Sequence, residues 1–484
     1  MSEVINLESF DYAFIDNFQN GELPENSQQH NKEVIDLLFN VISNVFLSIS
    51  ILLVQHINLN LLRSTPFDNP IACYNIVLIL VNFTIIPLSL GAMSVYDCFG
   101  SFASANSRYK QLSKLLHRTR ISVLLIYFTI SVPISIYSEQ IINLILGLTD
   151  EFQEGKTFIQ MYIHVIFIYI NFILNVKYLH ILGLFNYTIS LCLAYIVIST
   201  VTGYYLICVR ELGLLGMGYS MLLSTSILIL ISLHFMNKLS RVNINTYKVN
   251  KKVFKNPYFF NYIRLSIGSG LIYFMDYLMY LLIIVEIYRE NIFYNLNWLI
   301  IDYLYIMKSV ANGSSLSLTS RICYYLTVNK HTNIKNSIVM FVKIIGSFCI
   351  LSCAFNMIIF DKLIPNSNNT DPQVIIILKV YTLYIFIDYG ISIMSAITRS
   401  ISSHNRLTLL PQILIYFFLE LINLIYHIDF RSQWYIYVTL TSVILMLNLI
   451  WMNSIDWKKE VLEMKNFINE EKRLEIDKFY NYYN

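Results

Sequence analysis

Three aspartates lie inside long apolar stretches of this chain, where a carboxylate is energetically costly. Asp276 lies in the segment YFMDYLMY, Asp302 in LIIDYLYI and Asp388 in YIFIDYGIS. Inserting a charged side chain at the centre of a bilayer costs about 3 kcal/mol. Burial favours the neutral form of a carboxyl group, so a carboxyl in such a place can take up and release a proton or hold a cation. The three aspartates are therefore candidate proton- or cation-binding residues.

Tyrosines flank all three aspartates. A tyrosine hydroxyl can form a hydrogen bond with a carboxyl group, and its ring face attracts a cation. Around Asp276 we expect Tyr273, Tyr277 and Tyr280 to line a cavity. The alternative interpretation is that each aspartate is a structural group paired with a lysine of a neighbouring span. Three lysines within apolar stretches are candidates for such pairs: Lys308, Lys343 and Lys379.

The composition predicts that most of the chain is shielded from water. Of 484 residues, 56% are hydrophobic and 13% are charged, whereas soluble proteins carry roughly a quarter charged residues. The apolar runs are about 20 residues long and do not alternate with period two, as spanning helices require. A net charge of +3 gives no argument for nucleic-acid binding, and the seven cysteines form no C-x-x-C pair. The predicted fold class is an all-α polytopic membrane protein.

The apolar runs predict twelve transmembrane helices arranged as two lobes of six. The predicted spans of the first lobe are Val34–Ile57, Ile71–Tyr96, Ile121–Ser138, Phe158–Leu182, Tyr187–Val209 and Leu212–Met236. Those of the second lobe are Tyr262–Ile287, Phe293–Leu318, Ile338–Ile359, Val374–Ile397, Leu407–Ile425 and Trp434–Met452.

Lysine and arginine gather after the second and sixth predicted spans and in the C-terminal tail. Because basic residues are retained on the cytosolic side, both termini are predicted to be cytosolic. The predicted organisation is a disordered tail (1–30), an N-lobe (31–237), a basic linker (238–258), a C-lobe (259–455) and an amphipathic tail (456–484).

The two halves also align with each other at an offset of about 222 residues. Gly91 falls on Gly313, and Lys177 falls on Arg399. Six spans per half preserve orientation, so the halves are predicted to be parallel repeats related by an axis along the membrane normal. Two lobes that enclose a central cavity are typical of alternating access and are not required for an enzyme.

Several different short motifs follow one another along the chain. They include VYDCFGSFASANSRYKQ with Asp97, KYLH with Lys177, SRICYYL with Arg321, AITRS with Arg399, and DWKKE after the last span. Together they resemble the motifs of the multidrug and toxin extrusion (MATE) transporters over about residues 33–465. The sequence departs from that family in its first span, which lacks the expected proline, and in most of its loop glycines.

The resemblance implies roles for the residues singled out above. Asp276, Asp302 and Asp388 match acidic positions in the second-lobe cavity of eukaryotic MATE transporters, although a further acidic position of that motif is Leu281 here. The matched residues at the cytosolic ends of helices are expected to act as a gate: Asp97, Lys177, Arg321 and Arg399. The implied coupling ion is a proton, with sodium as the alternative, and no other cofactor is expected.

The predicted function is secondary active antiport, in which organic cations or xenobiotics leave in exchange for protons. The expected partners are that solute and the bilayer, with no nucleic acid, and a monomer is expected. One rival is a flippase for a lipid-linked oligosaccharide, which would carry Arg or Lys in its cavity to bind phosphate. Another is a major-facilitator-type porter, whose loop signature G-x-x-x-D-R-x-G-R-R is missing after the second span. The sequence contains no evident cluster of catalytic residues, so an enzyme is not predicted.

Overall fold

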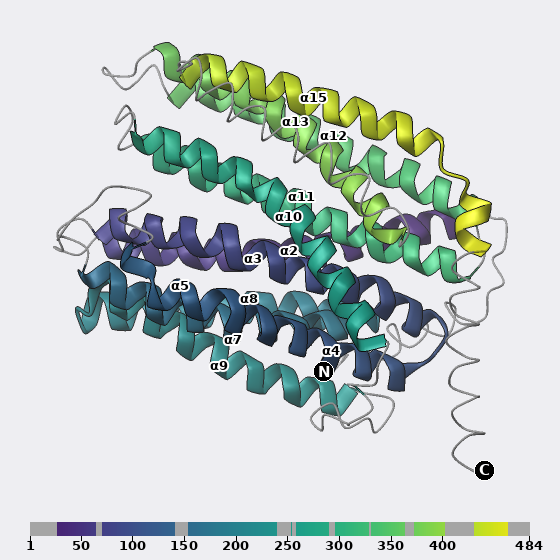
Figure 1. Ribbon diagram of the computed structural model, residues 1–484, viewed down its shortest axis with the longest axis horizontal. Helices are drawn as coiled ribbons and strands as arrows, with labels where there is room; N and C mark the ends of the chain where they lie inside the picture. Colours follow the sequence, from purple (N-terminus) through teal and green to yellow (C-terminus); the bar gives the residue numbers. More distant parts are fainter. Residues whose placement is uncertain are drawn as a thin grey trace, which may run out of the picture.

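A computed structural model describes residues 27–63, 70–140, 153–239, 253, 258–289, 296–328, 331–363, 372–401 and 430–462. Within α10 and α11, the side chains of residues 275–289 and 296–305 lie outside this description. All regular structure in the described residues is helical (Figure 1).

Each predicted span except Leu407–Ile425 coincides with a helix; that span lies outside the described residues, so the total of twelve stays a prediction. The helices of the first half are α2 (Ser27–Arg63), α3 (Pro70–Ala105), α4 (Tyr109–Ile126), α5 (Val132–Ile136), α7 (Gln153–Ile181), α8 (Phe185–Gly203) and α9 (Gly213–Leu239). Those of the second half are α10 (Tyr258–Arg289), α11 (Leu296–Thr327), α12 (His331–Leu363), α13 (Pro372–Ser400) and α15 (Phe430–Asn453).

Two predicted spans contain a turn of π-helix. The segment Tyr127–Ser131 joins α4 to α5, and Tyr204–Val209 continues α8. Pro133 follows the first of these turns, and Pro87 lies inside α3. Proline lacks the N–H that an α-helix needs in its interior, so these points are where the helices can bend.

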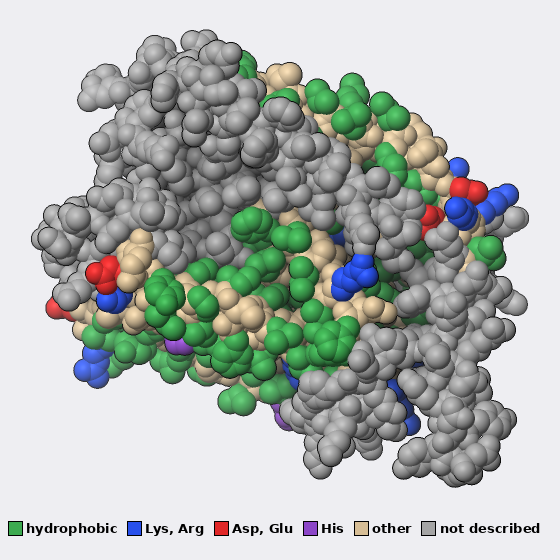
Figure 2. Space-filling model, viewed as in Figure 1, with side chains coloured by type: hydrophobic (Ala, Val, Ile, Leu, Met, Phe, Trp, Pro, Cys, Tyr) green, Lys and Arg blue, Asp and Glu red, His purple; other side chains and the backbone are tan. Residues whose placement is uncertain are grey.

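The surface is that of a membrane protein. Among the described residues, seven helical segments are long and apolar enough to cross a bilayer. Large apolar side chains are exposed on several of them, for example Val201, Leu230 and Leu351 at 64–69% exposure. Figure 2 shows apolar side chains across the middle of one face, with most of the charged side chains drawn toward the two ends. The chain is therefore a multi-pass membrane protein.

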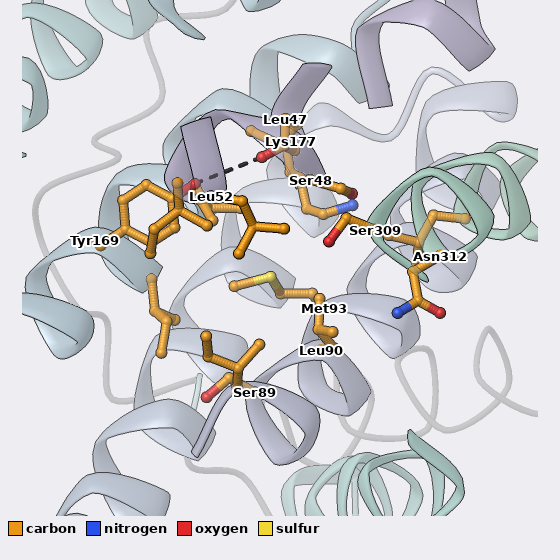
Figure 3. Close-up of a pocket in the computed structure, with 15 residues that line it drawn as sticks. Leu47, Ser48, Leu52, Ser89, Leu90, Met93, Tyr169, Lys177, Ser309 and Asn312 are labelled. Atoms are coloured by element: carbon orange, nitrogen blue, oxygen red, sulfur yellow. Dashed lines mark hydrogen bonds between the residues drawn. The ribbon is translucent and has the colours of Figure 1, made fainter. Parts of the chain in front are cut away.

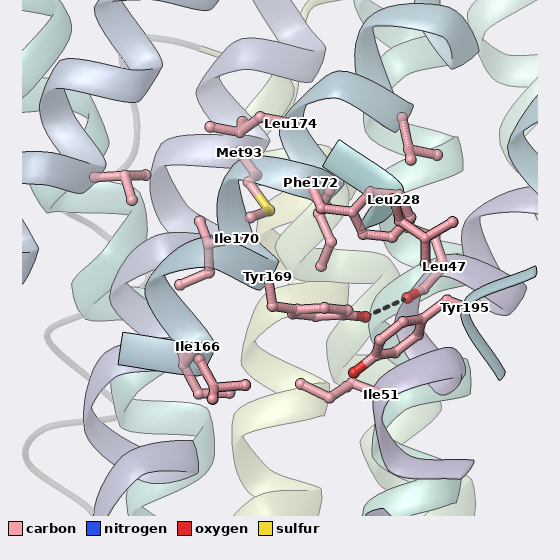
Figure 4. Close-up of a cluster of buried hydrophobic side chains, with 14 of the residues drawn as sticks. Leu47, Ile51, Met93, Ile166, Tyr169, Ile170, Phe172, Leu174, Tyr195 and Leu228 are labelled. Atoms are coloured by element: carbon pink, nitrogen blue, oxygen red, sulfur yellow. Dashed lines mark hydrogen bonds between the residues drawn. The ribbon is translucent and has the colours of Figure 1, made fainter. Parts of the chain in front are cut away.

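The buried side chains form two separate hydrophobic cores. The first joins α2, α3, α4, α7, α8 and α9 and also takes in Tyr262 of α10; Figure 4 shows its centre, where Tyr169, Phe172 and Tyr195 lie together. The second joins α11, α12, α13 and α15, and it also takes in Leu37 and Val41 of α2 and Phe102 of α3. We call these groups of helices the N-lobe and the C-lobe and assign α10 to the C-lobe because it begins the second half of the chain.

The lobes meet through α3 against α10 and through α2 against α11. These helices lie between the outer layers of the two lobes in Figure 1. At Gly91 the backbones approach so closely that a Cβ atom would lie 2.1 Å from the Gly270 nitrogen. At Gly313 a Cβ would lie 2.8 Å from the Asn44 carbonyl oxygen. Only glycine permits such an approach.

Hydrogen bonds also join the two lobes in this region. The Asn44 amide donates to Ser317 Oγ at 2.8 Å, and the Thr119 and Tyr262 hydroxyls are 2.6 Å apart. These contacts lie in the half of the molecule where α2 begins and α3 ends. We call this half the closed end; the predicted orientation would place it on the cytosolic side.

Candidate functional site

A cavity lies between the lobes. The empty space between its walls, together with the space open to the surroundings at its mouth, amounts to about 700 Å³. Its walls come from three N-lobe helices and one C-lobe helix (Figure 3). The lining residues are Leu47, Ser48, Ile51 and Leu52 of α2; Ile86, Ser89, Leu90 and Met93 of α3; Tyr169, Ile170, Ile173 and Lys177 of α7; and Ser309, Asn312 and Leu316 of α11.

Helical periodicity explains why these residues share one space. On α11 the lining positions are three and four residues apart, and the other three helices follow the same spacing. Residues at that spacing lie on one face of a helix. Small polar residues on this face, such as Ser309 and Asn312, were not singled out from the sequence. Their spacing within an apolar helix is the signal that could have found them.

Some polar side chains of the cavity already form hydrogen bonds within the protein. Ser89 donates to the Ile85 carbonyl oxygen of its own helix at 2.8 Å, and the Tyr169 hydroxyl lies 3.1 Å from Ser50 Oγ. Figure 3 shows the side chains of Lys177, Ser48 and Ser309 converging in one part of the cavity.

Lys177 forms a buried ion pair with Asp97. The Lys177 Nζ lies 2.5 Å from Asp97 Oδ2, and the two side chains are 1% and 4% exposed. The pair joins α7 to α3 within the N-lobe. Removing either partner would leave a buried charge without compensation. The structure thus brings together two of the four residues predicted to form a gate.

A second buried ion pair lies in the C-lobe. The Lys308 Nζ of α11 is 2.6 Å from Asp388 Oδ1 of α13, and the Tyr384 hydroxyl donates to the same oxygen at 3.4 Å. Both charged side chains are buried. Of the lysine pairings considered from the sequence, this one is present. It makes Asp388 part of a structural pair and leaves its role in proton or cation binding a proposal.

The other two predicted gate residues are buried arginines that pack on tyrosine rings. The Arg399 guanidinium lies 4.5 Å from the centroid of the Tyr273 ring and donates to Ser315 Oγ at 2.9 Å. The Arg321 guanidinium lies 5.4 Å from the Tyr325 ring centroid. Each contact joins a cation to an aromatic face inside the C-lobe or at its border.

Arg399 corresponds to Lys177 in the predicted internal repeat, but in the described part of the chain it forms no ion pair like that of Lys177. Lys177 and Arg399 are 222 positions apart, and the residue 222 positions after Asp97 is Thr319. Thr319 Oγ1 donates to the Ala396 carbonyl oxygen at 3.3 Å, so it still joins α11 to α13. The corresponding position in the second half therefore keeps the hydrogen-bonding role and loses the negative charge.

The remaining predicted residues are placed only in part. Asp276, Tyr277 and Tyr280 lie on α10 and Asp302 lies on α11, but their side chains are outside the described residues. Tyr273 was expected to line a cavity; its ring is fully buried against Arg399 and is not among the lining residues of the cavity in Figure 3.

Two thiols face each other across the lobes at the closed end. Cys98 of α3 and Cys323 of α11 are both buried, and their thiols are near enough to interact with each other. Their helices belong to different lobes, so this contact must separate if the closed end opens.

The chain is similar to known proteins in structure, whereas comparisons of its sequence find no match. No protein-family model matches the chain, and no curated protein matches it. The structure resembles that of the eukaryotic MATE transporter AtDTX14, with a TM-score of 0.77 and 15% identity over 90% of this chain and 99% of that one.

Two further solved structures are similar. An outward-facing multidrug resistance MATE transporter of the MOP superfamily matches with a TM-score of 0.71 and 15% identity, covering 89% of this chain and 96% of that one. A MOP superfamily transporter from Pyrococcus furiosus, described as having a binding pocket of reverse polarity, gives a TM-score of 0.70 at the same identity and coverage. The chain therefore has the fold of the MATE transporters, as the resemblance in the sequence predicted.

Proposed function

We propose that this protein is a secondary active antiporter that exports organic cations or amphipathic xenobiotics in exchange for protons. The observation that carries the proposal is the cavity of about 700 Å³ whose walls come from both lobes. A cavity of that kind can be exposed to either side of the membrane when the lobes rotate about it. The MATE fold supports the same interpretation.

Alternating access would work through the contacts at the closed end. The glycine contacts at Gly91 and Gly313 and the hydrogen bond between Asn44 and Ser317 hold the lobes together there. No covalent link joins the lobes among these contacts, and opening would exchange them for contacts at the opposite end. A solute or proton that binds one arrangement better than the other shifts the equilibrium toward it.

Proton coupling is proposed to use the C-lobe carboxylates. When Asp388 is ionised, Lys308 neutralises it at 2.6 Å. When Asp388 binds a proton, the pair loses its attraction and Lys308 keeps a charge that must find another partner. Such a change in a buried charge is large enough to favour a different packing of α11 against α13. We propose that Asp276 and Asp302, on α10 and α11, take part in the same exchange.

Reconstituted protein provides the test. Wild-type protein and Asp388→Asn are placed in proteoliposomes, a pH gradient is imposed, and uptake of a fluorescent organic cation and of a fluorescent amphipathic acid is followed. We expect gradient-dependent uptake by the wild type and its loss in Asp388→Asn. The control is Glu139→Gln, which removes an exposed carboxylate from the pair with Lys156 and should leave uptake unchanged.

Two results would contradict the coupling proposal. Full gradient dependence in Asp388→Asn would remove Asp388 from the coupling mechanism. Uptake that responds to a sodium gradient and not to a pH gradient would show that sodium, and not the proton, is the coupling ion.

A lipid flippase is the second candidate, because a basic residue lines the cavity. Lys177, which is paired with Asp97, is the basic residue among the lining residues that the structure describes. A phosphate-bearing lipid would be recognised by such a charge. Translocation of a fluorescent lipid-linked phosphate between leaflets, without movement of either water-soluble probe, would favour this function over antiport.

A further inference from the structure

One face of α4 changes from basic to apolar along its length. Lys110, Lys114 and Arg118 follow one another at intervals of four residues, so they share this face. The same face continues with Leu125 and with Phe128 of the π-helical turn after α4, which are 42% and 60% exposed. Because α4 begins where α3 ends, the basic half of the face lies toward the closed end. The face therefore has the polarity of a phospholipid, with a charged head and an apolar tail.

The apolar part of this face has the length of one leaflet. Phe128 comes ten residues after Arg118, which corresponds to about 15 Å along a helix axis. One leaflet provides half of a hydrocarbon core roughly 30 Å thick. An acyl chain whose headgroup lies near Arg118 can therefore follow the exposed side chains of α4 to its tip.

Helix α10 carries an exposed cation within an apolar face. Phe260, Ile267 and Leu271 are 62%, 52% and 41% exposed. Arg264 is exposed as well and lies between them on the same side of the helix. Within the part of the chain that the structure describes, Arg264 forms no salt bridge. A guanidinium in such a place can form two parallel hydrogen bonds with a phosphate.

The two faces meet beside each other, as the beginning of α10 next to α4 shows in Figure 1. The Thr119 hydroxyl of α4 lies 2.6 Å from the Tyr262 hydroxyl of α10, and Arg118 interacts electrostatically with Tyr262. Lys114 shares the face of Arg118, so it also lies on the side of α4 that is turned toward α10. The long side chains of lysine and arginine extend toward the headgroup region from deeper positions. Lys114 and Arg264 can therefore reach the same phosphate.

Acidic side chains are missing from the sequence around this contact. Residues 109–126 of α4 and 258–275 of α10 contain no aspartate or glutamate, and neither does the segment 240–257 that precedes α10. Lysine and arginine near a membrane surface attract acidic phospholipids. The charge of the contact is thus complementary to an acidic headgroup.

We propose that an acidic phospholipid binds between α4 and α10, in the leaflet at the closed end. Its phosphate accepts hydrogen bonds from Lys114 and Arg264, and Arg118 adds a positive charge beside it. One acyl chain follows the apolar part of the α4 face, and the other packs against the exposed side chains of α10. This lipid is a bound partner of the transporter and not its solute, so the proposal does not depend on what the cavity between the lobes carries.

Two labelled lipids test the headgroup preference. Phosphatidylglycerol and phosphatidylcholine, each with the same fluorophore at the end of one acyl chain, are titrated against the full chain in a non-ionic detergent, and fluorescence anisotropy gives each Kd. We expect phosphatidylglycerol to bind roughly tenfold more tightly, because nearby lysine and arginine side chains attract an acidic headgroup. Equal binding of the two lipids, tighter binding of phosphatidylcholine, or binding of neither would overturn the proposal.

Charge variants locate the contact. Lys114→Gln/Arg264→Gln should bring the preference for phosphatidylglycerol to near one, and Arg264→Gln alone, at an exposed position, should lower it about threefold. Lys114→Arg/Arg264→Lys keeps both charges and should keep the preference. Lys238→Gln/Lys335→Gln removes two exposed cations from α9 and α12 and is the matched control. Full preference in a double variant that melts like the wild type, or an equal loss in the control, would refute the assigned site.

A soluble phosphate ester separates a lipid site from a phosphate site. Glycerol 3-phosphate carries the phosphate without acyl chains, so we expect a large molar excess of it to leave labelled phosphatidylglycerol bound. Displacement at a concentration close to the Kd of the lipid would overturn the choice of a lipid. Phe128→Ala/Ile267→Ala, which reduces the two apolar faces, should weaken binding of both labelled lipids and leave their ratio unchanged.

Discussion

At the scale of single residues, the buried ion pairs are the most consequential feature. Lys177 and Asp97 pair in the N-lobe at 2.5 Å, and Lys308 and Asp388 pair in the C-lobe at 2.6 Å. In the bilayer a buried charge without a partner is costly, so each pair constrains the two helices that carry it. The N-lobe pair lies beside the cavity between the lobes, and the other pair lies within the C-lobe, where a change in charge can alter how α11 and α13 pack.

The first prediction concerns the stability of the N-lobe pair. Lys177→Met should lower the free energy of unfolding by about 3–5 kcal/mol, because it leaves Asp97 buried and uncompensated. Adding Asp97→Asn should recover most of that loss. Thermal unfolding of the purified protein in detergent, read as the shift in Tm, measures both effects.

The exposed pair between Lys156 and Glu139 supplies the matched control. Its side chains are 41% and 59% exposed. Lys156→Met should therefore change the stability by less than about 1 kcal/mol. A single variant at Lys177 that is no less stable than the one at Lys156 would contradict the role given to the buried pair.

At the scale of helices, the fit between the lobes depends on positions where two backbones touch. Gly91 of α3 meets Gly270 of α10, and Gly313 of α11 meets Asn44 and Val45 of α2. The two contacts occupy corresponding places in the two halves, since Gly91 and Gly313 are 222 residues apart. A repeat whose halves contact each other in the same way makes the closed end nearly symmetric.

The second prediction is that a larger residue at Gly313 opens the closed end. A Cβ there would lie 2.8 Å from both the Asn44 oxygen and the Val45 Cα, and these are backbone atoms that cannot move aside cheaply. Gly313→Val should therefore lower the yield of an oxidative cross-link between Cys98 and Cys323 several-fold. Gly346→Ala, where no atom lies within 4 Å of the added Cβ, is the control and should leave the yield unchanged.

At the scale of the whole molecule, two lobes with separate hydrophobic cores meet through α2 against α11 and α3 against α10, and a cavity lies between them. Each lobe has a hydrophobic core of its own, and α2 and α3 of one lobe pack along α11 and α10 of the other. The contacts between the lobes include close glycine approaches, hydrogen bonds and buried apolar side chains such as Tyr262 and Phe102. This arrangement suits transport, since it permits movement without unfolding either core.

The third prediction uses the native thiols as a reporter of that movement. Copper phenanthroline should link Cys98 to Cys323 across the lobes, hold the closed end shut and stop transport in proteoliposomes. Dithiothreitol should restore transport. Cys98→Ser should transport normally and resist the oxidant. Undiminished transport by the cross-linked wild type would show that the closed end does not open during the cycle.

Much of this architecture follows from the sequence alone. Long apolar runs determine spanning helices, because the backbone in a bilayer must satisfy its own hydrogen bonds. The motifs around Asp97, Lys177, Arg321 and Arg399 pointed to the MATE fold, which the structural comparison confirms. Gly91 and Gly313 could be matched by their offset before any contact was known, since a repeat places equivalent residues at equivalent depths.

The tertiary structure decided which side chains meet. A sequence places Lys308 and Asp388 in apolar spans but not at 2.6 Å from each other, because their separation depends on how α11 and α13 rotate and pack. It likewise could not show that Lys177, rather than an aspartate, lines the described cavity. Helical periodicity defines the faces of each span, whereas the packing between helices determines which faces enclose a cavity and what charge that cavity presents.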